Sequence, residues 1–358
     1  MDIASWVNRV DVRLRMTVGE QSELIAVLGP DVIDFASYAH TMLAGGKRFR
    51  AIFCALGYAT VSPTLPDSLC DLAVGLEIFH AAALAHDDIM DRSDTRRGAP
   101  AAHRRFEQRH RVNGWAGDAS HFGIASALLF GDFLLALSDV CVARGLAAHD
   151  DSKASMATRV EFDRMRLDVT AGQYLDIVEE SAWPTVASDE ALDRASTVLT
   201  YKSAKYSIEA PLAMGALLAG AKPNTVTALR AFALPLGNAF QLRDDILGVF
   251  GDPEVTGKPV GDDLREGKRT VLIALTMSAL DSHSRDELNA VLGNESASDD
   301  AIAWAQNLCE STGARAQVEA RIEAEFSRAL EALDKCTIDA DVRATLVELA
   351  HRVVRRDF

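Results

Sequence analysis

Residues 86–98, HDDIMDRSDTRRG, concentrate opposed charges in one short segment. Asp87, Asp88, Asp91 and Asp94 lie within eight positions, and two arginines follow at once. On a helix, Asp87 and Asp91 project within ~40° of each other and repel, because they lie four residues apart. Carboxylates grouped in this way suit Mg²⁺, which binds through a few carboxylates together with substrate phosphates. A solvent-exposed helix end is the alternative interpretation of this cluster taken alone.

A second acidic pair lies in the segment FQLRDDILG at 240–248. Asp244 and Asp245 end an apolar stretch there, and Gln241 lies one turn upstream. Two apolar helices that each end in paired aspartates can hold a metal cluster between them if they face one another. Such metals would clamp a phosphate group from both sides.

Four groups of basic residues accompany the aspartates. They are Lys47, Arg48 and Arg50 in GGKRFR, Arg96 and Arg97 in TRRG, Lys202 and Lys205 in YKSAK, and Lys258 and Lys268 in TGKPVGDDLREGKRT. Arginine forks match phosphate oxygens bidentately, and lysines supply compact point charges. Each group alone is typical of ordinary surface charge. Together with two metal-type clusters, they predict a site for two polyanions, one bound through metal and one held by side chains.

Helices must position these groups, because helical periodicity dominates the chain. The predicted helices lie at 68–91, 122–147, 228–251 and 314–333. The first has apolar residues at three- and four-residue intervals, and the last is typical of an outer amphipathic helix. The second is apolar nearly all round, which predicts a helix at the centre of a bundle. Pro235 predicts a kink in the third.

The predicted fold class is therefore all-α, a single large helical bundle spanning residues 1–358. The chain has 358 residues and 48% hydrophobic content, enough for a substantial core. Loop signals at 61–68, 220–225 and 250–263 are too short to be clear domain linkers. Helices as apolar as 122–147 could also pair with a second copy of the chain.

Composition argues against several classes of protein. A net charge of −15 makes nucleic acid an unsuitable partner, since phosphate binding needs a basic surface. We find no apolar stretch of the ~20 residues that a membrane span needs, and no signal peptide in MDIASWVNRVDVRLRM. The five cysteines are scattered and lack metal-type spacing, which indicates buried thiols in a reducing cytoplasm. We expect a cytoplasmic protein.

The order and spacing of the motifs resemble the trans-isoprenyl diphosphate synthases, the polyprenyl synthetase family, and most of all its bacterial geranylgeranyl diphosphate synthases. The resemblance covers about residues 40–275 and rests on GGKRFR, HAAALAHDDIMDRSDTRRG, FGD, YKSAK, FQLRDDILG and GKPVGDDLREGKRT. It implies an α-helical bundle around a central cavity, a homodimer and three Mg²⁺ per active site. It also implies Mg²⁺-dependent, head-to-tail condensation of isopentenyl diphosphate with an allylic diphosphate.

The resemblance further implies a role for each matching residue. Asp87, Asp91 and Asp244 should bind Mg²⁺, with Asp88 and Asp245 in support. The allylic diphosphate should be held by Arg96, Lys202, Gln241 and Lys258, with Ser203 where the family often has Thr and Lys268 as a further candidate. Isopentenyl diphosphate should be held by Lys47, Arg50, His80 and Arg97. On an apolar helix face, His80 could instead be a core histidine.

Two positions depart from the family pattern. The second motif normally reads DDxxD, but position 248 is Gly. Ala51 replaces the Pro that often follows the GGKR box, a change that we expect to be minor.

The length of the product depends on residues below the first acidic cluster. Ala83 and Ala82 lie one turn below Asp87, where family members that stop at fifteen carbons usually carry an aromatic ring. Phe79 lies two turns, or ~12 Å, below the metals. If Phe79 is the floor of the cavity, the product is geranylgeranyl diphosphate; if it only packs in the core, a longer polyprenyl diphosphate is the main alternative.

Other activities remain as alternatives. Farnesyl diphosphate is a shorter possible product. A class I terpene cyclase also uses an aspartate-rich motif, but it has no need of the basic set Lys47, Arg50 and Arg97. A non-catalytic subunit of a heteromeric synthase would tend to lose aspartates or lysines that are present here. The sequence does not predict the preferred allylic primer.

Overall fold

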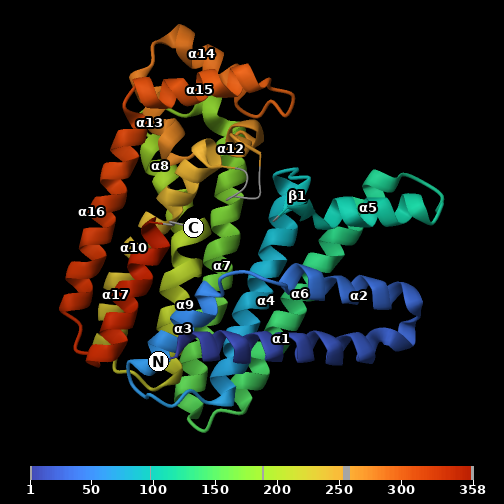
Figure 1. The fold of residues 1–358 in the computed structure, drawn as a ribbon, viewed down its shortest axis with the longest axis vertical. Helices are drawn as coiled ribbons and strands as arrows, with labels where there is room; N and C mark the ends of the chain where they lie inside the picture. The colour runs from blue at the N-terminus through green and yellow to red at the C-terminus, as the bar shows by residue number, and fades with distance from the viewer. Residues whose placement is uncertain (1, 97, 188, 253–258, 356–358) are drawn as a thin grey trace. The chain divides into compact units, whose positions relative to one another are not determined.

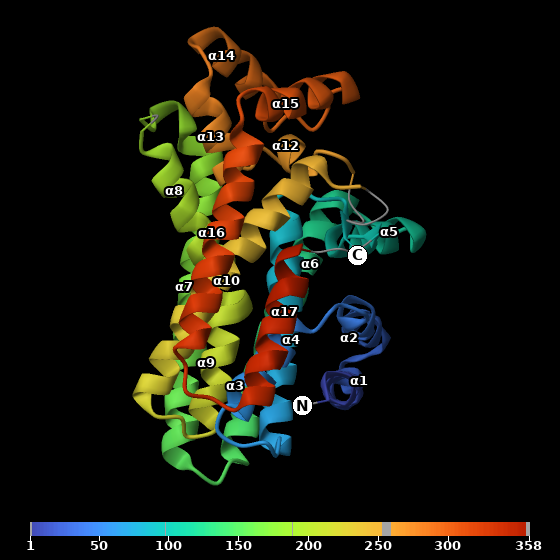
Figure 2. The same ribbon diagram turned by 60° about the vertical axis from the view of Figure 1, so that its left-hand side comes forward.

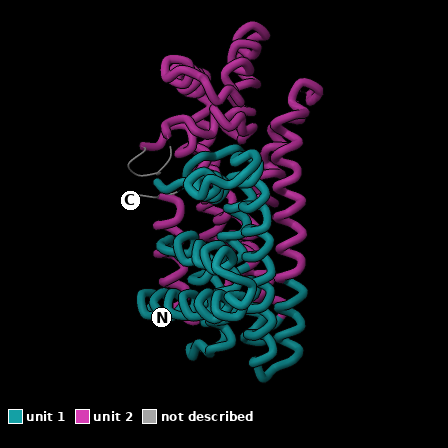
Figure 3. Tube along the Cα trace, turned by 90° about the vertical axis from the view of Figure 1, so that its right-hand side faces the viewer, with its two compact units in different colours: residues 1–161, 211–222 teal, residues 162–210, 223–358 magenta. Residues whose placement is uncertain are grey.

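Helices form almost all of the secondary structure of the computed structural model, which describes residues 2–96, 98–187, 189–252 and 259–355 (Figure 1). The predicted all-α fold class is confirmed. The chain divides into two compact units, shown in Figure 3. Unit 1 comprises residues 1–161 and 211–222, and unit 2 comprises residues 162–210 and 223–358. The chain passes between the units inside continuous helical segments at residues 161–162 and 210–211 and in the short connection before residue 223. No sequence linker marks the boundary, and the single domain stays a prediction.

Unit 1 holds the N-terminal helices and the first acidic motif. Its elements are α1 (Ile3–Ile25), η1 (Ala26–Leu28), α2 (Pro30–Leu43), α3 (Phe49–Ala59), α4 (Asp67–Met90), β1 (Thr95–Arg96), β2 (Ala99–Pro100), α5 (Ala102–Val112), α6 (Ala119–Ala147), the first part of α7 (Ser152–Ala182) and most of α9 (Ala210–Leu218).

Unit 2 holds the rest of α7 and the second acidic motif. Its other elements are η2 (Trp183–Thr185), α8 (Ala191–Val198), the π-helix η3 (Leu199–Glu209), α10 (Pro223–Phe250), α12 (Asp262–Glu266), α13 (Val271–Ala279), α14 (Ser282–Val291), α15 (Asp299–Ser311), α16 (Ala314–Asp334) and α17 (Ala340–Arg355).

In unit 1, the long helices α4 and α6 pack along one another at very short range. A Cβ atom added at Gly75 would lie 2.5 Å from Val142 Cγ2, and one at Gly145 would lie 2.6 Å from the Ser68 carbonyl oxygen. The Ser138 hydroxyl donates to the Gly75 carbonyl oxygen at 2.7 Å. Glycine at these positions therefore allows the close approach that holds the end of α4 in place.

In unit 2, α10 packs against α16, as Figures 1 and 2 show, and it also packs against η3. The Arg243 guanidinium donates to both carboxylate oxygens of Glu319 on α16, at 2.6 and 2.7 Å. A Cβ atom added at Gly237 would lie 2.7 Å from the Ala204 carbonyl oxygen on η3. Pro235 lies inside α10. Helix α10, which carries the second acidic motif, is thus fixed from two sides.

All four predicted helices are present. The predicted segments 68–91, 122–147, 228–251 and 314–333 correspond to α4, α6, α10 and α16. The outer amphipathic character of α16 is confirmed, because Val318, Ile322, Phe326 and Leu333 are buried at intervals of four or seven residues.

The prediction that 122–147 is a central helix is wrong for one face of α6. Ile124, Leu128, Leu129 and Val140 are exposed in the single chain, with Leu129 61% accessible. A helix that is apolar all round needs cover on every side. One apolar side of α6 is therefore exposed in the single chain, where another protein surface could cover it.

The expectation that no segment is apolar enough to span a bilayer needs correction in one respect. By length and composition alone, α4 and α6 could cross a membrane. The most apolar window of α4 is 83% buried, so its apolar composition is that of a core helix. The corresponding window of α6 is only 39% buried.

The five cysteines are buried and free, as the sequence predicted. Burial raises the pKa of the Cys70 thiol to about 11 and that of Cys141 to about 12. These thiols stay neutral at physiological pH and are inert core residues.

Candidate active site

The first acidic cluster lies at the C-terminal end of α4. The helix ends at Met90, and Asp91 is its C-cap residue, whose backbone N–H donates to the Asp87 carbonyl oxygen at 2.8 Å. Asp88 is fully buried and Asp91 is 9% exposed. The apolar body of α4 therefore carries its carboxylates to a sheltered place, and a solvent-exposed helix end does not describe this cluster.

Arg96 belongs to the same cluster. Strand β1 pairs antiparallel with β2, with Arg96 opposite Ala99, and this hairpin turns the side chain back toward α4. The Arg96 Nε donates to Asp88 Oδ1 at 2.8 Å, Nη2 donates to the same oxygen, and Nη2 lies 3.6 Å from Asp87 Oδ2. The guanidinium thus lies where a diphosphate held by these aspartates would meet it. Arg97 lies outside the described residues.

The GGKR box contains a structural arginine, Arg48, between Lys47 and Arg50. Arg48 is buried, lies 2.8 Å from Asp11 and 3.5 Å from Glu77, and donates to the Leu43 carbonyl oxygen. Glu77 also accepts from the Ala51 backbone N–H at 3.1 Å. Arg48 therefore fastens the loop to α4.

The other described residues expected to hold isopentenyl diphosphate are close in sequence to Arg48 or to its partner Glu77. Lys47 is exposed, and Arg50 and His80 are half-buried. His80 follows Glu77 by three residues on α4, so the two project from neighbouring positions of one helix face.

The second acidic cluster lies on α10 in unit 2. The Gln241 side-chain amide donates to Asp245 Oδ1 at 2.8 Å and to Asp244 Oδ2 at 3.5 Å. Burial raises the pKa of Asp245 to about 8, against the hydrogen bond from Gln241; the negative charges of Asp263 and Asp244 raise it further, and Lys268 opposes them. In the metal-free protein, Asp245 is therefore protonated at neutral pH, and a cation would favour its ionised form.

The two lysines of YKSAK both point to carboxylates of α7. Lys202 Nζ donates to Asp176, and Lys205 Nζ donates to Asp168 Oδ2 at 2.9 Å. A Cβ atom at Gly172 would lie 2.4 Å from the Lys202 backbone nitrogen, so this glycine lets η3 lie against α7. The π-helical turn of η3 is a form that occurs mostly as short bulges, often at functional sites. Ser203 is half-buried on this segment.

Close packing of η3 on α10 brings Lys202 and Gln241 to one region of unit 2. Besides the contact of Gly237 with Ala204, the Thr200 hydroxyl donates to Asn238 Oδ1 at 3.4 Å. Lys268 lies 2.8 Å from Glu266 and 3.8 Å from Asp263. Lys258 lies outside the described residues.

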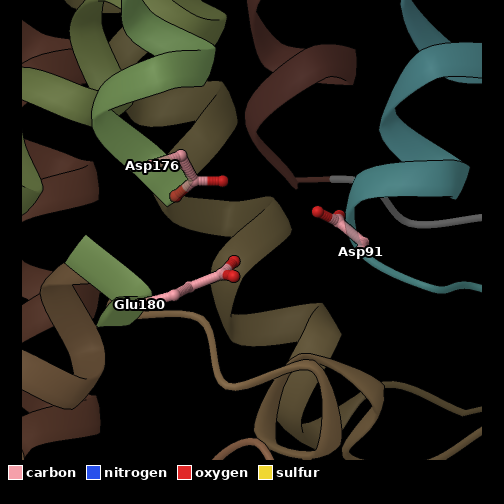
Figure 4. A group of neighbouring side chains, drawn as sticks. All are labelled: Asp91, Asp176 and Glu180. Atoms are coloured by element: carbon pink, nitrogen blue, oxygen red, sulfur yellow. The ribbon is translucent and has the colours of Figure 1, made fainter. Parts of the chain in front are cut away.

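Sequence analysis missed two acidic residues of α7, Asp176 and Glu180. Figure 4 shows their side chains on successive turns of the helix, and their nearest ligand oxygens lie within 4.8 Å of each other. The figure also labels Asp91 of unit 1. The available signal was their four-residue spacing in DIVEE, the same as that of Asp87 and Asp91.

The donor atoms in both units fit a magnesium ion. Asp87 and Asp91 in unit 1, and Asp176, Glu180 and Asp244 in unit 2, offer only carboxylate oxygens, which Mg²⁺ prefers over nitrogen or sulfur ligands. A divalent cation would also offset the repulsion among carboxylates that are largely removed from water.

The residues expected to limit product length lie inside unit 1. Phe79 is 5% exposed, Ala82 is fully buried and Ala83 is half-buried. Their burial is compatible both with a cavity wall and with ordinary core packing.

The profile of the polyprenyl synthetase family matches residues 34–309. The chain belongs to the polyprenyl synthetase family. The geranylfarnesyl diphosphate synthase of Aeropyrum pernix is 31% identical to this polyprenyl synthetase over 335 residues, which cover 91% of this chain and 95% of the relative. The (2E,6E)-farnesyl diphosphate synthase of Mycobacterium tuberculosis is 35% identical over 81% of this chain and 74% of its own.

A solved structure resembles the polyprenyl synthetase over nearly its whole length. The geranylgeranyl pyrophosphate synthase of Corynebacterium glutamicum, complexed with isoprenyl diphosphate and magnesium, matches with a TM-score of 0.93 and 38% identity. The match covers 99% of this chain and 100% of that one. The protein is thus a trans-prenyltransferase, and its relatives differ in the length of the product that they are named for.

Proposed function

We propose that this polyprenyl synthetase condenses isopentenyl diphosphate with an allylic diphosphate, head to tail and with Mg²⁺, and releases geranylgeranyl diphosphate. One observation carries the proposal: each acidic cluster lies on an apolar helix, and in the same unit a basic side chain contacts carboxylates. In unit 1 these carboxylates belong to the cluster itself, and in unit 2 the carboxylate belongs to α7. Arg96 contacts Asp87 and Asp88, and Lys202 contacts Asp176.

In the proposed reaction, three Mg²⁺ per active site neutralise the diphosphate leaving group. Asp87, Asp91 and Asp244 hold the metals, with Asp88 and Asp245 in support and with Asp176 and Glu180 as further carboxylates. Asp88 holds Arg96 in the orientation that meets the diphosphate oxygens, a role that the 2.8 Å hydrogen bond supports.

The basic residues divide between the two substrates. Arg96, Lys202, Gln241, Lys258 and Lys268 orient the allylic diphosphate, with Ser203 beside them, and Lys47, Arg50, His80 and Arg97 hold isopentenyl diphosphate. Breaking the allylic C–O bond gives a resonance-stabilised carbocation, which the double bond of isopentenyl diphosphate attacks. The departing diphosphate accepts the proton lost, so no side-chain base is needed. Apolar walls must exclude water, which would otherwise quench the cation to an alcohol.

The relatives are named for products of different length and include farnesyl, geranylgeranyl and geranylfarnesyl synthases. We assign a twenty-carbon product because the small side chains of Ala82 and Ala83 would leave room for the growing chain beneath Asp87, and because Phe79 carries a ring two turns further down α4. A longer polyprenyl or a farnesyl product remains the alternative.

We also propose that the protein is a cytoplasmic homodimer. The exposed residues Ile124, Leu128, Leu129 and Val140 form an apolar face on α6 of a length that a second copy could cover. Association would remove this face from water, at roughly 25 cal/mol per Å² of apolar surface.

Incubation of the purified chain with isopentenyl diphosphate and dimethylallyl, geranyl or farnesyl diphosphate tests the function. Chromatography of the dephosphorylated products should show geranylgeraniol, and EDTA should abolish it. Turnover of an allylic diphosphate without isopentenyl diphosphate would favour a terpene cyclase. Inactivity of the folded chain with every primer would favour a non-catalytic subunit.

A further inference from the structure

The GGKR box has an unusual backbone conformation. Gly45 and Gly46 have φ angles of 70° and 88°, which glycine adopts readily, but Arg48 has a φ of 53°. Residues with a Cβ atom rarely adopt this left-handed conformation, and Arg92 is the other non-glycine example among the described residues. Such a conformation persists only where the surrounding contacts hold it, so the contacts of Arg48 show what shapes the box.

The Arg48 side chain is directed into the protein, and an acid of α4 faces it there. The side chain is 6% exposed, and its Nη1 lies 3.5 Å from Glu77 Oε2. Asp11 of α1 is a second anion beside it, at 2.8 Å. Lys47 is exposed and Arg50 is half-buried. The inward side chain of Arg48 therefore fixes the backbone between two residues that we expect to hold isopentenyl diphosphate.

Helix α3 begins directly after Arg48, and its cap comes from another helix. Arg48 occupies the N-cap position, where Ser, Thr, Asp or Asn usually accepts a hydrogen bond from the first turn, but its side chain makes no such bond. The N–H of Ala51, the third residue of that turn, donates to Glu77 Oε1 at 3.1 Å. Ala51 is fully buried and Glu77 is 5% exposed, so this bond is sheltered from water. A carboxylate of α4 therefore caps α3, at the helix end where a negative charge is favoured.

The hydrogen bond to Glu77 depends on the residue at position 51. Family members often carry proline there, and proline has no backbone N–H to donate. The alanine of this chain supplies the donor. This departure from the family pattern therefore adds a contact between the GGKR box and α4.

Glu77 links the box to the helix that carries another residue of the same substrate site. Its two oxygens contact Arg48 and Ala51, which lie on either side of Arg50 in the chain. On α4, His80 follows Glu77 by three residues. One carboxylate thus fixes the backbone around Arg50 relative to the turn of α4 that carries His80.

We propose that Glu77 is a positioning residue for isopentenyl diphosphate: it holds the GGKR box so that Lys47 and Arg50 meet the diphosphate group. A carboxylate repels a diphosphate, so Glu77 acts through its contacts with the box and not as a ligand. This inference rests on the proposed function, which assigns Lys47 and Arg50 to that substrate.

Steady-state kinetics of the full chain, with each substrate varied in turn, tests the inference. Glu77→Ala removes both contacts and should raise the KM for isopentenyl diphosphate roughly tenfold or more, as loss of a hydrogen bond to a charged group predicts. Glu77→Gln keeps an oxygen for the Ala51 N–H but loses the charge beside Arg48, so a smaller rise of about three- to tenfold is expected. The KM for the allylic diphosphate and kcat should stay within about twofold of the wild type in both variants.

Asp71→Asn is the matched control for a loss of stability alone. Asp71 is another buried carboxylate of α4, with a side chain 5% exposed, and it pairs with Arg13 at 2.7 Å and with Arg144 at 2.9 Å. The variant should lower the melting temperature, as the Glu77 variants do, because it breaks a buried ion pair. Both KM values should stay within about twofold of the wild type. A merely structural role of Glu77 would give the same kinetic result as this control.

Ala51→Pro isolates the hydrogen bond. In the wild-type background it removes the donor and should raise the KM for isopentenyl diphosphate about threefold or more. In the Glu77→Ala background the acceptor is already missing, so the same change should add less than about twofold. Proline also restrains the residue before it, Arg50, but that effect would be equal in the two backgrounds.

Each outcome bears on a different claim. A folded Glu77→Ala variant that leaves the KM for isopentenyl diphosphate unchanged, or raises both KM values alike, would overturn the inference, as would an equal effect of Ala51→Pro in the two backgrounds. If Glu77→Ala does not fold, Glu77→Gln decides: a selective rise in the KM for isopentenyl diphosphate supports the inference, and no rise overturns it. A folded wild type that is inactive with every primer, or a Lys47→Ala variant with an unchanged KM for isopentenyl diphosphate, would instead overturn the proposed function.

Discussion

Arg96 and Asp88 form a buried ion pair between the β1–β2 hairpin and the last turn of α4, with Asp88 fully removed from solvent and the Arg96 side chain 18% exposed. The pair ties together two segments of one motif that are eight residues apart. It places the guanidinium that we expect to meet the diphosphate against two carboxylates of the first acidic cluster.

Replacing Arg96 with Ala should therefore cost stability as well as activity. Removing one partner of a buried ion pair leaves the other charge poorly compensated, which typically costs about 3–5 kcal/mol. Arg328→Ala is the matched control, because Arg328 is 65% exposed in its pair with Glu325 and such surface pairs contribute about 0–1 kcal/mol. Urea unfolding followed by circular dichroism measures both; equal losses for the two variants would contradict the structural role of Arg96.

Lys202 and Lys205 give a matched pair for the allylic site, since both lie on η3 and both contact α7. Lys202→Ala should raise the KM for the allylic diphosphate roughly 10–100-fold, as loss of a charge-assisted hydrogen bond of about 1.5–3 kcal/mol predicts. The KM for isopentenyl diphosphate should change little. Steady-state kinetics with each substrate varied in turn measures both KM values. A larger rise in the KM for the allylic diphosphate in Lys205→Ala than in Lys202→Ala would contradict the assignment.

The raised pKa of Asp245 makes the metal-free protein sensitive to pH. An unfolded Asp ionises near ~3.9, whereas in the folded chain the pKa of Asp245 is about 8, so the folded state holds its proton more tightly. The contribution of this group to stability is full below about pH 4 and is lost as the pH rises toward about 8. Asp245→Asn has no carboxyl to ionise, so the variant does not lose stability through this group as the pH rises.

In EDTA, the melting temperature of Asp245→Asn relative to the wild type should therefore rise between pH 5 and pH 8.5. Added Mg²⁺ with pyrophosphate should stabilise the wild type more than the variant, since only the wild type can offer an ionised carboxylate. A difference in melting temperature that is constant with pH would show that Asp245 does not titrate as described.

Residues below the first cluster should set the product length. Phe79→Ala removes the ring that we assign to the floor of the cavity and should lengthen the product. Ala83→Phe inserts a ring one turn below Asp87 and should shorten it. Chromatography of dephosphorylated products measures both, and an unchanged distribution in the two variants would remove the length assignment.

The apolar face of α6 predicts a dimer that a single charge disrupts. Leu128→Glu should shift the protein toward monomer, because a carboxylate in an apolar interface loses its hydration. Leu24→Glu, which also replaces an exposed leucine in unit 1, should leave association unchanged. Light scattering coupled to size-exclusion chromatography measures the mass; a monomeric wild type would contradict the homodimer itself.

Local patterns were sufficient to predict much of this fold. Helices α4, α10 and α16 follow from the spacing of apolar residues, and Asp87, Asp91 and Arg96 come together because a helix end and a tight hairpin place them there. Sequence alone could not show that one face of α6 lacks cover, since hydropathy reports what a helix can bury and not what lies beside it.

The missed features depend on contacts between distant segments. Asp176 was not recognised because its partner Lys202 lies 26 positions away on a π-helix whose approach depends on Gly172. The hydrogen bond from the Ala51 N–H to Glu77 likewise depends on how α3 packs against α4. Such pairings depend on how helices pack, and they produce no periodic pattern in the sequence.

The contact between Arg48 and Asp11 extends the working part of the enzyme upstream of its recognisable motifs. The family profile begins at residue 34, and nothing in α1 resembles a catalytic signature. Yet a shortened version that starts at the profile boundary would take away an anion 2.8 Å from the arginine that secures the GGKR loop. A truncated protein without α1 should therefore hold the GGKR loop less rigidly, although every residue of the motifs would still be present.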